Sequence, residues 1–424
     1  MSVKIALLGC GTVGKAVAKA LKAQSKDFTA RVGAELELVG IGVRNVDAPR
    51  DPDIDRSLLT DDLEALTAKA DIVIELIGGI EPARSLVHKA IENGATVVTG
   101  NKALLAEYGP EIYEAAAKAD VDVYYEAAVA GAVPVVYGLR ESLAGDRVET
   151  VAGILNGTTN FILDEMENNG LSFDEALKLA QDLGFAEADP TADVDGHDAA
   201  AKIAILASLA FHTRVSIKDV PTTGIRQITA ENIAAAKADG YAIKLLGIAS
   251  RRENGIELSV EPTLVPLDHP LAGVRGSFNS IVIEATGAGR LMFYGRGAGG
   301  APTASAVLSD VVAGASHRVH GGQAPRELAY ADLPILQPEE GESSFRIEVA
   351  VTDRTGVLTQ LTGAFADNGV SIMAVRQTQI EDGVAKLIVT THTARTSSVK
   401  SAIEVIEKAD YAKGVLQVMR VEGN

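Results

Sequence analysis

Residues 3–14 read VKIALLGCGTVG, an apolar run that passes directly into a glycine-rich turn. The run Val3–Leu8 predicts a buried strand, and an amphipathic helix is predicted to follow through about Lys22. A G-x-G-x-x-G motif alone is weak evidence, but between a strand and a helix it is typical of a dinucleotide site with its phosphates at the helix N-terminus. The residues expected to bind the cofactor here are Gly9, Gly11, Thr12, Val13 and Gly14.

Further strand-like runs alternate with helical stretches through the first third of the chain. They lie at Leu36–Val43, Asp71–Ile77, Ala95–Thr99 and Val121–Tyr125. This alternation predicts an α/β fold in which a Rossmann-type, doubly wound parallel sheet binds the cofactor at the carboxyl ends of its strands.

The end of the second strand indicates which cofactor binds. An acidic residue there would bind the ribose hydroxyls of NAD, whereas this chain has Arg44. Arginine suits a 2′-phosphate, so NADP is favoured over NAD, although Arg44 as a solvated loop charge remains an equal alternative.

The composition favours small ligands over macromolecular ones. The chain has 424 residues, 47% of them hydrophobic, and a formal net charge of −18. That charge disfavours nucleic acid and anionic membranes, and no apolar run is long enough to span a bilayer. The single cysteine, Cys10, is expected to be a small residue that packs in the interior. One cysteine cannot form an intrachain disulfide, which fits a reducing, cytoplasmic location.

Residues 180–202 read AQDLGFAEADPTADVDGHDAAAK, an acidic stretch that leads into a predicted apolar helix. Asp198 and Lys202 are four residues apart, which places both on one helical face, where the carboxylate can hold the ammonium. Partial burial of Lys202 would favour proton transfer. The alternative is that Asp198 and Lys202 form only a structural salt bridge at the start of a helix. Glu187 and Asp193 add further negative charge nearby, and so many acidic side chains together favour a site that binds a ligand or cations.

Lys102 is a second candidate for the chemistry. The segments Glu75–Gly79 and Thr99–Lys102 both follow predicted parallel strands, where ligands bind. The helix dipole disfavours a positive charge at a helix N-terminus, so Lys102 is less well explained as an ordinary surface lysine. We expect Lys102 to bind cofactor or substrate as a fixed positive charge, in competition with Lys202 for the proton-donor role.

The middle of the chain predicts a second α/β domain. Strands are expected at Val148–Leu155, Tyr241–Ser250, Ile256–Leu264 and Asn279–Ala285, forming a mixed sheet. A loop of small polar residues that binds a polar substrate is expected at Asn156–Asn160, and a capped turn with Asn160 as an ordinary helix residue is the alternative. A glycine-rich stretch, Tyr294–Thr303, opens a helix that returns to the first domain.

The C-terminal part predicts a separate small module. Residues 321–343 lack periodicity and are expected to be a flexible linker. After them, strands and helices follow the order β-α-β-β-α-β of a ferredoxin-like fold. With DRTGVL at 353–358 and NGVSI at 368–372, residues 344–424 resemble an ACT domain, an amino-acid-sensing module.

Several motifs together resemble homoserine dehydrogenase over residues 1 to about 320. They are Gly9–Gly14, Glu75–Gly79, Thr99–Lys102, Gly153–Asn160, Ala180–Lys202 and Gly295–Ser305. The resemblance implies reduction of L-aspartate 4-semialdehyde to L-homoserine with NAD(P)H, in the biosynthesis of threonine, methionine and isoleucine.

The resemblance also implies roles for individual residues. Lys202 would transfer the proton and Asp198 would orient it, with Lys102 as the competing candidate for the proton transfer. Substrate contacts would come from Glu187, Asp193, Gly157 and Thr158. Gly184 and Gly299 would approach the cofactor. A structural sodium ion would be held by Glu126, Val129, Gly131 and Val133.

These inferences divide the chain into four parts. We expect a cofactor domain at 1–134 with the returning helix 302–320, a substrate and dimerisation domain at 135–301, the linker, and the ACT domain. No fused kinase is expected, because the nucleotide motif begins at the ninth residue. L-threonine is the expected inhibitor, and the protein is expected to be a homodimer or homotetramer. The alternatives are another NAD(P)-dependent oxidoreductase of a small amino-acid carbonyl and a non-catalytic cofactor-binding sensor.

Overall fold

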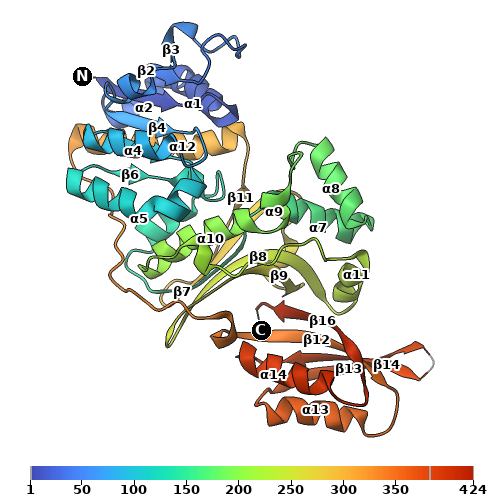
Figure 1. The fold of residues 1–424 in the computed structure, drawn as a ribbon. Helices are drawn as coiled ribbons and strands as arrows, with labels where there is room; N and C mark the ends of the chain where they lie inside the picture. Colours follow the sequence, from blue (N-terminus) through green and yellow to red (C-terminus); the bar gives the residue numbers. More distant parts are fainter. Residues whose placement is uncertain (1, 382, 424) are drawn as a thin grey trace. The chain divides into compact units, whose positions relative to one another are not determined.

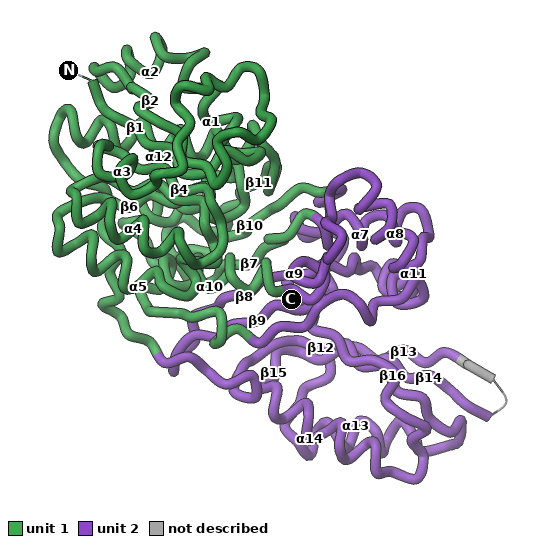
Figure 2. Tube along the Cα trace, turned by 45° about the horizontal axis from the view of Figure 1, so that its top comes forward, with its two compact units in different colours: residues 1–157, 197–220, 277–333 green, residues 158–196, 221–276, 334–424 purple. Residues whose placement is uncertain are grey.

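The computed structural model describes residues 2–381 and 383–423 (Figure 1). The chain forms two compact units (Figure 2). Unit 1 comprises residues 1–157, 197–220 and 277–333, and unit 2 comprises residues 158–196, 221–276 and 334–424.

Unit 1 is built on a six-stranded parallel sheet in the order β3-β2-β1-β4-β5-β6. The order reverses between β1 and β4, as it does in doubly wound folds, so the predicted Rossmann-type sheet is confirmed. The strands are β1 (Ser2–Leu8), β2 (Glu35–Gly42), β3 (Leu59–Thr60), β4 (Ile72–Glu75), β5 (Thr96–Thr99) and β6 (Val123–Tyr124).

Alternation along β1 explains why helices cover both faces of this sheet. Ile5 and Leu7 belong to one core, and Ala6 and Leu8 belong to the other. The first core takes residues of α1 (Thr12–Ala23), α2 (Ser25–Val32) and the returning helix α12 (Gly300–His320). The second takes residues of α3 (Leu63–Thr67), α4 (Ala83–Glu92) and α5 (Lys102–Ala119).

Unit 1 also contains three antiparallel strands and one buried helix. Strand β10 (Phe278–Ala285) pairs with β7 (Val148–Ile154) and with β11 (Gly289–Arg296). The predicted strands do not include β11. Helix α10 (His197–Phe211) buries nearly all of its residues, as its composition predicts.

In unit 2, β8 (Tyr241–Arg252) and β9 (Gly255–Pro266) form a long hairpin. Before residue 334, the helices of this unit are α8 (Phe173–Asp182), α9 (Thr191–Val194), α11 (Ala230–Ala238) and all but the first residue of α7 (Gly157–Asn169). The expectation of a loop over Asn156–Asn160 is wrong, because residues 157–160 form the first turn of α7.

The C-terminal module has the predicted β-α-β-β-α-β order. Its elements are β12 (Glu342–Thr352), α13 (Val357–Asp367), β13 (Ile372–Glu381), β14 (Val384–Thr391), α14 (Thr396–Glu407) and β16 (Ala412–Val421), with a short β15 (Ala394–Arg395) beside β12. Its strands lie in the order β16-β12-β14-β13, and β16 continues in parallel onto β9 at Arg420 and Thr263.

The segment predicted to be a flexible linker has little regular structure, yet specific contacts hold it. The Tyr125 hydroxyl donates a hydrogen bond to Glu327, and the Ala331 N–H donates to the His212 carbonyl at 3.1 Å. Tyr330 stacks on the His212 ring with centroids 4.6 Å apart. The expectation of flexibility was therefore wrong for residues 327–331, because buried and stacked side chains anchor them.

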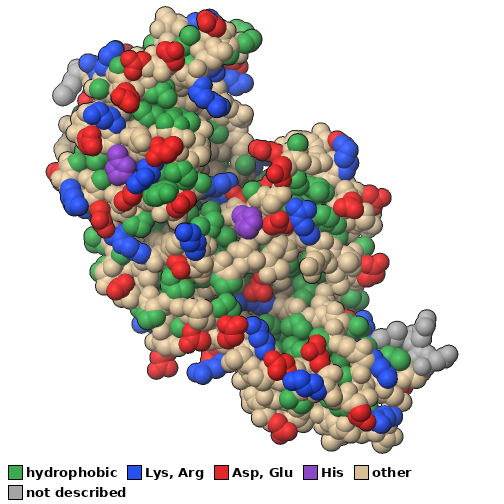
Figure 3. All heavy atoms as spheres, viewed as in Figure 1, with side chains coloured by type: hydrophobic (Ala, Val, Ile, Leu, Met, Phe, Trp, Pro, Cys, Tyr) green, Lys and Arg blue, Asp and Glu red, His purple; other side chains and the backbone are tan. Residues whose placement is uncertain are grey.

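The surface has no single dominant sign of charge on the face that Figure 3 shows. Acidic and basic side chains are interspersed there, so the net charge of −18 does not gather into one patch in that view. Within the described residues, no helix is both long and apolar enough to cross a membrane.

Candidate active site

The centre of the candidate site is one buried carboxylate that pairs with two lysines. Asp198 is 6% exposed, and its Oδ2 accepts a hydrogen bond from Lys202 Nζ at 2.7 Å. Its other oxygen, Oδ1, pairs with Lys102 Nζ, which comes from the start of α5. The structure thus brings together the two lysines that the sequence offered as competitors.

The charges of this triad stabilise one another. Burial alone would raise the pKa of Asp198, but the ammonium groups of Lys202 and Lys102 outweigh it and hold that pKa well below its usual range. Asp198 is therefore ionised at neutral pH. The two lysines differ in access, because the Lys202 side chain is 10% exposed and that of Lys102 is 45% exposed.

Neighbouring polar groups fix the orientation of the triad. Asn156 Nδ2 donates to Asp198 Oδ2 at 2.8 Å, and Lys202 Nζ donates to the Leu155 carbonyl at 2.7 Å. That carbonyl also accepts from Asn279 Nδ2 at 2.9 Å. Strand β7 ends immediately before Leu155, so the strand end sets where Lys202 points. Sequence reasoning placed Asn156 in a polar loop after a strand but did not identify it as a partner of Asp198.

A second network holds Lys102 at the first position of α5. Asn101 caps the helix through Oδ1, which accepts from the Leu104 N–H at 3.1 Å. The Asn101 N–H donates to Thr99 Oγ1, whose hydroxyl donates to the fully buried Glu75 at 2.7 Å. Glu75 also accepts from the Ile77 N–H at 2.8 Å. One carboxylate therefore joins the ends of β4 and β5, as their parallel register predicts.

The glycine-rich turn has the backbone geometry of a phosphate-binding loop. Gly9 has φ +102°, and a Cβ there would lie 2.6 Å from the Leu76 carbonyl oxygen. A Cβ on Gly14 would lie 2.1 Å from the Gly9 oxygen, so neither position accepts a side chain. At Gly11, which caps α1, a Cβ would meet nothing within 4 Å. That open face at a helix N-terminus fits a dinucleotide phosphate.

The region after β2 contains one more arginine than sequence reasoning identified. Arg44 is exposed two residues beyond the end of β2. Arg50 donates to the Asn45 carbonyl at 3.0 Å and to the Cys10 carbonyl at 3.5 Å. Arg50 therefore reaches from the Arg44 loop to the glycine turn, and no spacing motif in the sequence marks it.

Gly299 lies at the other side of the same turn. It has φ +129° and precedes α12, and a Cβ on the next residue, Gly300, would lie 3.2 Å from the Thr12 carbonyl oxygen. The contact places Gly299 beside the glycine-rich turn, and its approach to the cofactor stays a prediction.

The remaining predicted substrate and cofactor residues lie around α7 and in the acidic segment. Gly157 starts α7, and Thr158 Oγ1 donates to the Phe185 carbonyl at 2.6 Å. Gly184 has φ +75°. Glu187 is exposed, and Asp193 is half-buried in α9.

The predicted sodium residues form a tight loop in unit 1. The Glu126 carboxylate accepts from the N–H groups of Val136 and Tyr137 at 3.0 and 2.7 Å. Burial raises the pKa of Glu126 to about 7. Gly131 has φ +56°, and the Val133 carbonyl accepts from the Val135 N–H at 2.8 Å. Each Glu126 oxygen thus accepts one backbone N–H and keeps further acceptor capacity, so a cation role for Glu126 and for the carbonyls of this loop stays a prediction.

Comparisons with known proteins agree with this arrangement. The family model described as "Homoserine dehydrogenase, NAD binding domain" matches residues 9–126, and the model described as "Homoserine dehydrogenase" matches residues 134–312. The ACT domain model matches residues 345–410.

Relatives that match along the whole chain carry the same description. The homoserine dehydrogenase of Corynebacterium glutamicum is 49% identical over 99% of this chain and 96% of its own length. A crystal structure of a homoserine dehydrogenase from Thiobacillus denitrificans is 41% identical, covers 100% of this chain and 98% of its own, and has a TM-score of 0.90. A hyperthermophilic archaeal homoserine dehydrogenase in complex with NADPH is 29% identical, with coverages of 74% and 97% and a TM-score of 0.63.

Proposed function

The chain belongs to the homoserine dehydrogenase family, NAD(P)-dependent oxidoreductases that reduce aspartate 4-semialdehyde to homoserine, and we propose how its residues carry out this reaction. The proposal rests on one observation: Lys102 and Lys202 both pair with the carboxylate of Asp198. A bound nicotinamide supplies the hydride to the aldehyde carbon.

In the proposed mechanism, Lys202 donates the proton that the carbonyl oxygen gains as hydride arrives. Asp198 stays ionised and holds the Lys202 ammonium toward the pocket, while Asn156 and Leu155 keep that geometry. Lys102, the more exposed lysine, contributes a fixed positive charge that stabilises the developing oxyanion. Glu187 and Asp193 bind the substrate ammonium, and Gly157 and Thr158 border the same substrate.

Replacing Asp198 tests this mechanism directly. Asp198→Asn should lower kcat for aspartate semialdehyde by about 10²-fold or more, because both lysines lose their charged partner, while NADPH binding changes little. Asp182→Asn is a matched control, because Asp182 forms an exposed (i,i+4) pair with Lys178. Unchanged kcat in Asp198→Asn would contradict the proposed role.

For the cofactor, we propose NADP in preference to NAD. Arg44 and Arg50 near the end of β2 supply the positive charge that a 2′-phosphate requires, and acidic side chains are absent from residues 43–46. The relative named with NADPH supports the same preference.

The ACT domain supports feedback regulation, for which we propose L-threonine as the inhibitor. The proposed site lies between the turn at 353–356 and Asn368–Gly369 in a pair of ACT modules. Strand β13 ends its sheet and exposes Met373 and Val375, and β11 exposes Met292 and Tyr294. These edges support a homo-oligomer, as a dimer or tetramer.

We further propose a structural sodium ion held by Glu126 and by the carbonyls of Val129, Gly131 and Val133. Replacing Na⁺ by choline in the buffer should lower the melting temperature of the protein.

The lone cysteine supports a cytoplasmic location. The four-part division at 134, 301, 320 and 343 remains our proposal for the functional domains.

A further inference from the structure

A pocket of about 370 Å³ lies inside unit 2, and none of the residues that line it belongs to the catalytic triad. Strand β9 forms one wall, and β16 and α14 of the ACT domain form the other. The wall from α14 presents apolar Val399 and Ile403 beside Thr396 and Lys400. The pocket therefore combines an apolar wall with charged and hydroxyl groups, as small polar-ligand sites do.

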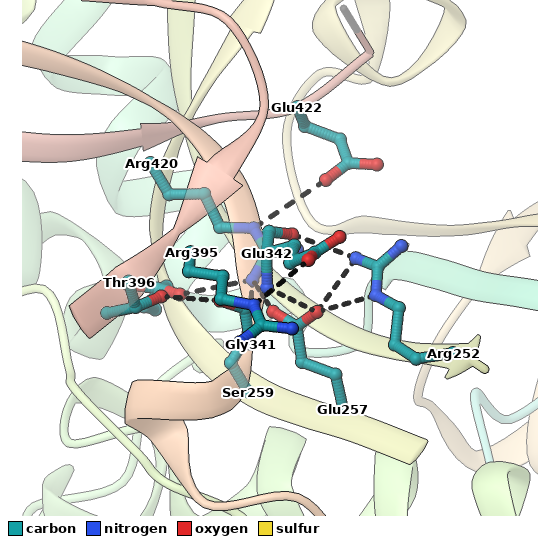
Figure 4. A network of polar contacts seen from close by, with 10 residues as sticks. Arg252, Glu257, Ser259, Gly341, Glu342, Arg395, Thr396, Arg420 and Glu422 are labelled. Carbon is teal, nitrogen blue, oxygen red and sulfur yellow. Dashed lines mark hydrogen bonds and ion pairs between the residues drawn. The ribbon is translucent and has the colours of Figure 1, made fainter. Parts of the chain in front are cut away.

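A buried ion network forms one side of this pocket (Figure 4). Arg420 is 6% exposed, and its Nη1 donates to Glu257 at 2.9 Å. Glu257 is also held by Arg252, whose Nη2 lies 2.7 Å away. Two arginines thus neutralise Glu257. Within the described part of the chain, Arg420 Nε has no hydrogen-bond partner, and its ion-pair partner Glu422 lies 3.9 Å away, too far for a hydrogen bond.

Glu261, on the same wall, is less well neutralised. Its carboxylate lies 3.7 Å from Arg420 Nη1, beyond hydrogen-bonding distance. Burial raises the pKa of Glu261 against the opposing effect of Arg420. A carboxylate in this state gains from a nearby cation such as a ligand ammonium.

We propose that this pocket binds a small α-amino acid as its zwitterion. Its carboxylate pairs with Arg420 and with Lys400, whose Nζ donates to Glu339 at 2.7 Å in the structure and would turn to the ligand, and its ammonium pairs with Glu261. Its side chain packs on Val399 and Ile403. A zwitterion supplies the acceptor and the cation together without adding net charge to the interior, which an anion or an amine alone cannot do.

The pocket also has a short physical connection to the acidic segment of unit 2. Thr223 lines the pocket, and its N–H donates to the Val260 carbonyl at 2.7 Å. Two residues on, the Ile225 N–H donates to the Val194 carbonyl at 2.8 Å. A Cβ on Gly224 would lie 2.1 Å from that same carbonyl, so the segments are in direct contact. A ligand that moves Thr223 therefore shifts the neighbours of Asp193, which bears on substrate affinity only if the proposed role of Asp193 holds.

Calorimetric titration of the full-length chain tests the site. The probes are glycine, L-alanine, L-valine and L-threonine, with N-acetyl-L-threonine and L-threonine amide as analogues that each lack one charge. Glu261→Gln and Lys400→Met should weaken binding about tenfold, because each removes a charge-assisted contact. Glu253→Gln and Lys408→Met are exposed controls on the β8–β9 turn and after α14, and they should bind as the unaltered chain does.

We expect at least one amino acid to bind, its charge-deleted analogues to bind at least tenfold more weakly, and Gly369→Asp to leave this binding unchanged. Binding of no probe at about 10 mM, or equal binding by Glu261→Gln, Lys400→Met and the controls, would overturn the proposal. Turnover of aspartate semialdehyde by the same preparations is measured in parallel. Its loss would count against the proposed mechanism rather than against this site.

Discussion

Asp198 shows how a single residue joins distant parts of the chain. It lies in α10 and pairs with Lys202 one turn away and with Lys102 from another helix. Leaving either lysine without this carboxylate would place a cation in a site with too little compensation. The three side chains therefore act as one unit, and their individual substitutions should not be additive.

Steady-state kinetics should distinguish the roles of Lys202 and Lys102. Lys202→Ala should reduce kcat by about 10²- to 10⁴-fold, because the proton donor is lost, while the glycine loop still binds cofactor. Lys102→Ala should act mainly on KM for the semialdehyde. Steady-state kinetics with a separate NADPH binding measurement checks both variants. A larger kcat loss in Lys102→Ala than in Lys202→Ala would mean that the roles are exchanged.

The preference for NADPH over NADH should also depend on a single residue. Arg44→Asp should shift the ratio of kcat/KM from NADPH toward NADH, because it exchanges a 2′-phosphate partner for an acceptor of ribose hydroxyls. Arg31→Asp on α2 is a control on the same unit, paired only with Asp27 among its described ion-pair partners. An unchanged ratio in Arg44→Asp would assign cofactor selection to Arg50 or to neither arginine.

At the scale of elements, strand ends and helix starts position the functional groups. The end of β7 sets the Leu155 carbonyl, and the ends of β4 and β5 are joined by Glu75. In unit 2, α7, β8 and the 3-10 turn Pro270–Gly273 meet around Lys244, which is 1% exposed. Its Nζ donates to Asn160 Oδ1 at 3.1 Å and to the Val274 carbonyl at 2.7 Å.

Lys244 should give the protein a measurable pH dependence of stability. Burial lowers its pKa to about 8, below the value of about 10.4 in an unfolded chain. Between these values the unfolded state binds more protons, so the free energy of unfolding should rise with pH, by at most about 3 kcal/mol. As pH falls through 8, that gain is lost.

Urea unfolding of Lys244→Met against the unaltered chain at pH 7.5 and pH 10 isolates this contribution. The difference in unfolding free energy between the two proteins should change with pH in the direction given above. Lys237→Met, in the last turn of α11, controls for the loss of one lysine. A difference that does not vary with pH would show that Lys244 is protonated to the same extent in both states.

At the scale of the whole molecule, the ACT domain is part of unit 2 rather than a loosely tethered module. Strand β16 pairs with β9, and Arg420 shares the buried Glu257 with Arg252. Removing the domain would expose these groups. The segment 327–331 belongs to unit 1 and contacts Tyr125 and His212 there, so a deletion that also removes it disturbs the catalytic body.

Truncation after Gln337 should therefore leave an active enzyme that no longer responds to threonine, with lower stability than the full chain. Truncation after Gly322 should cost more stability, because the Glu327 and Ala331 contacts are lost with it. Inhibition curves and melting temperatures of both forms test this. Equal inhibition of the truncated and full-length enzymes would contradict regulation through the ACT domain.

Gly369→Asp should weaken threonine inhibition several-fold without changing basal turnover. Gly369 follows α13 with φ +72°, which costs an ordinary residue about 1 kcal/mol or more, although a Cβ there would meet nothing within 4 Å. The strain should distort the proposed effector turn. Gly363→Asp, a glycine of α13 that also has open space, is the control. Equal inhibition constants for the two variants would exclude a specific role for the turn.

The sequence by itself determined the Rossmann-type sheet, the buried helix with its Asp198–Lys202 pair and the ACT order of elements. Those features depend on local periodicity, turn chemistry and (i,i+4) spacing, which neighbouring residues carry. Only the tertiary structure decided that Lys102 shares Asp198, that Arg50 reaches the glycine turn and that residues 327–331 are anchored. These contacts join residues dozens to hundreds of positions apart, and no local pattern encodes such a distance. They depend instead on which strand ends and helices the fold packs together.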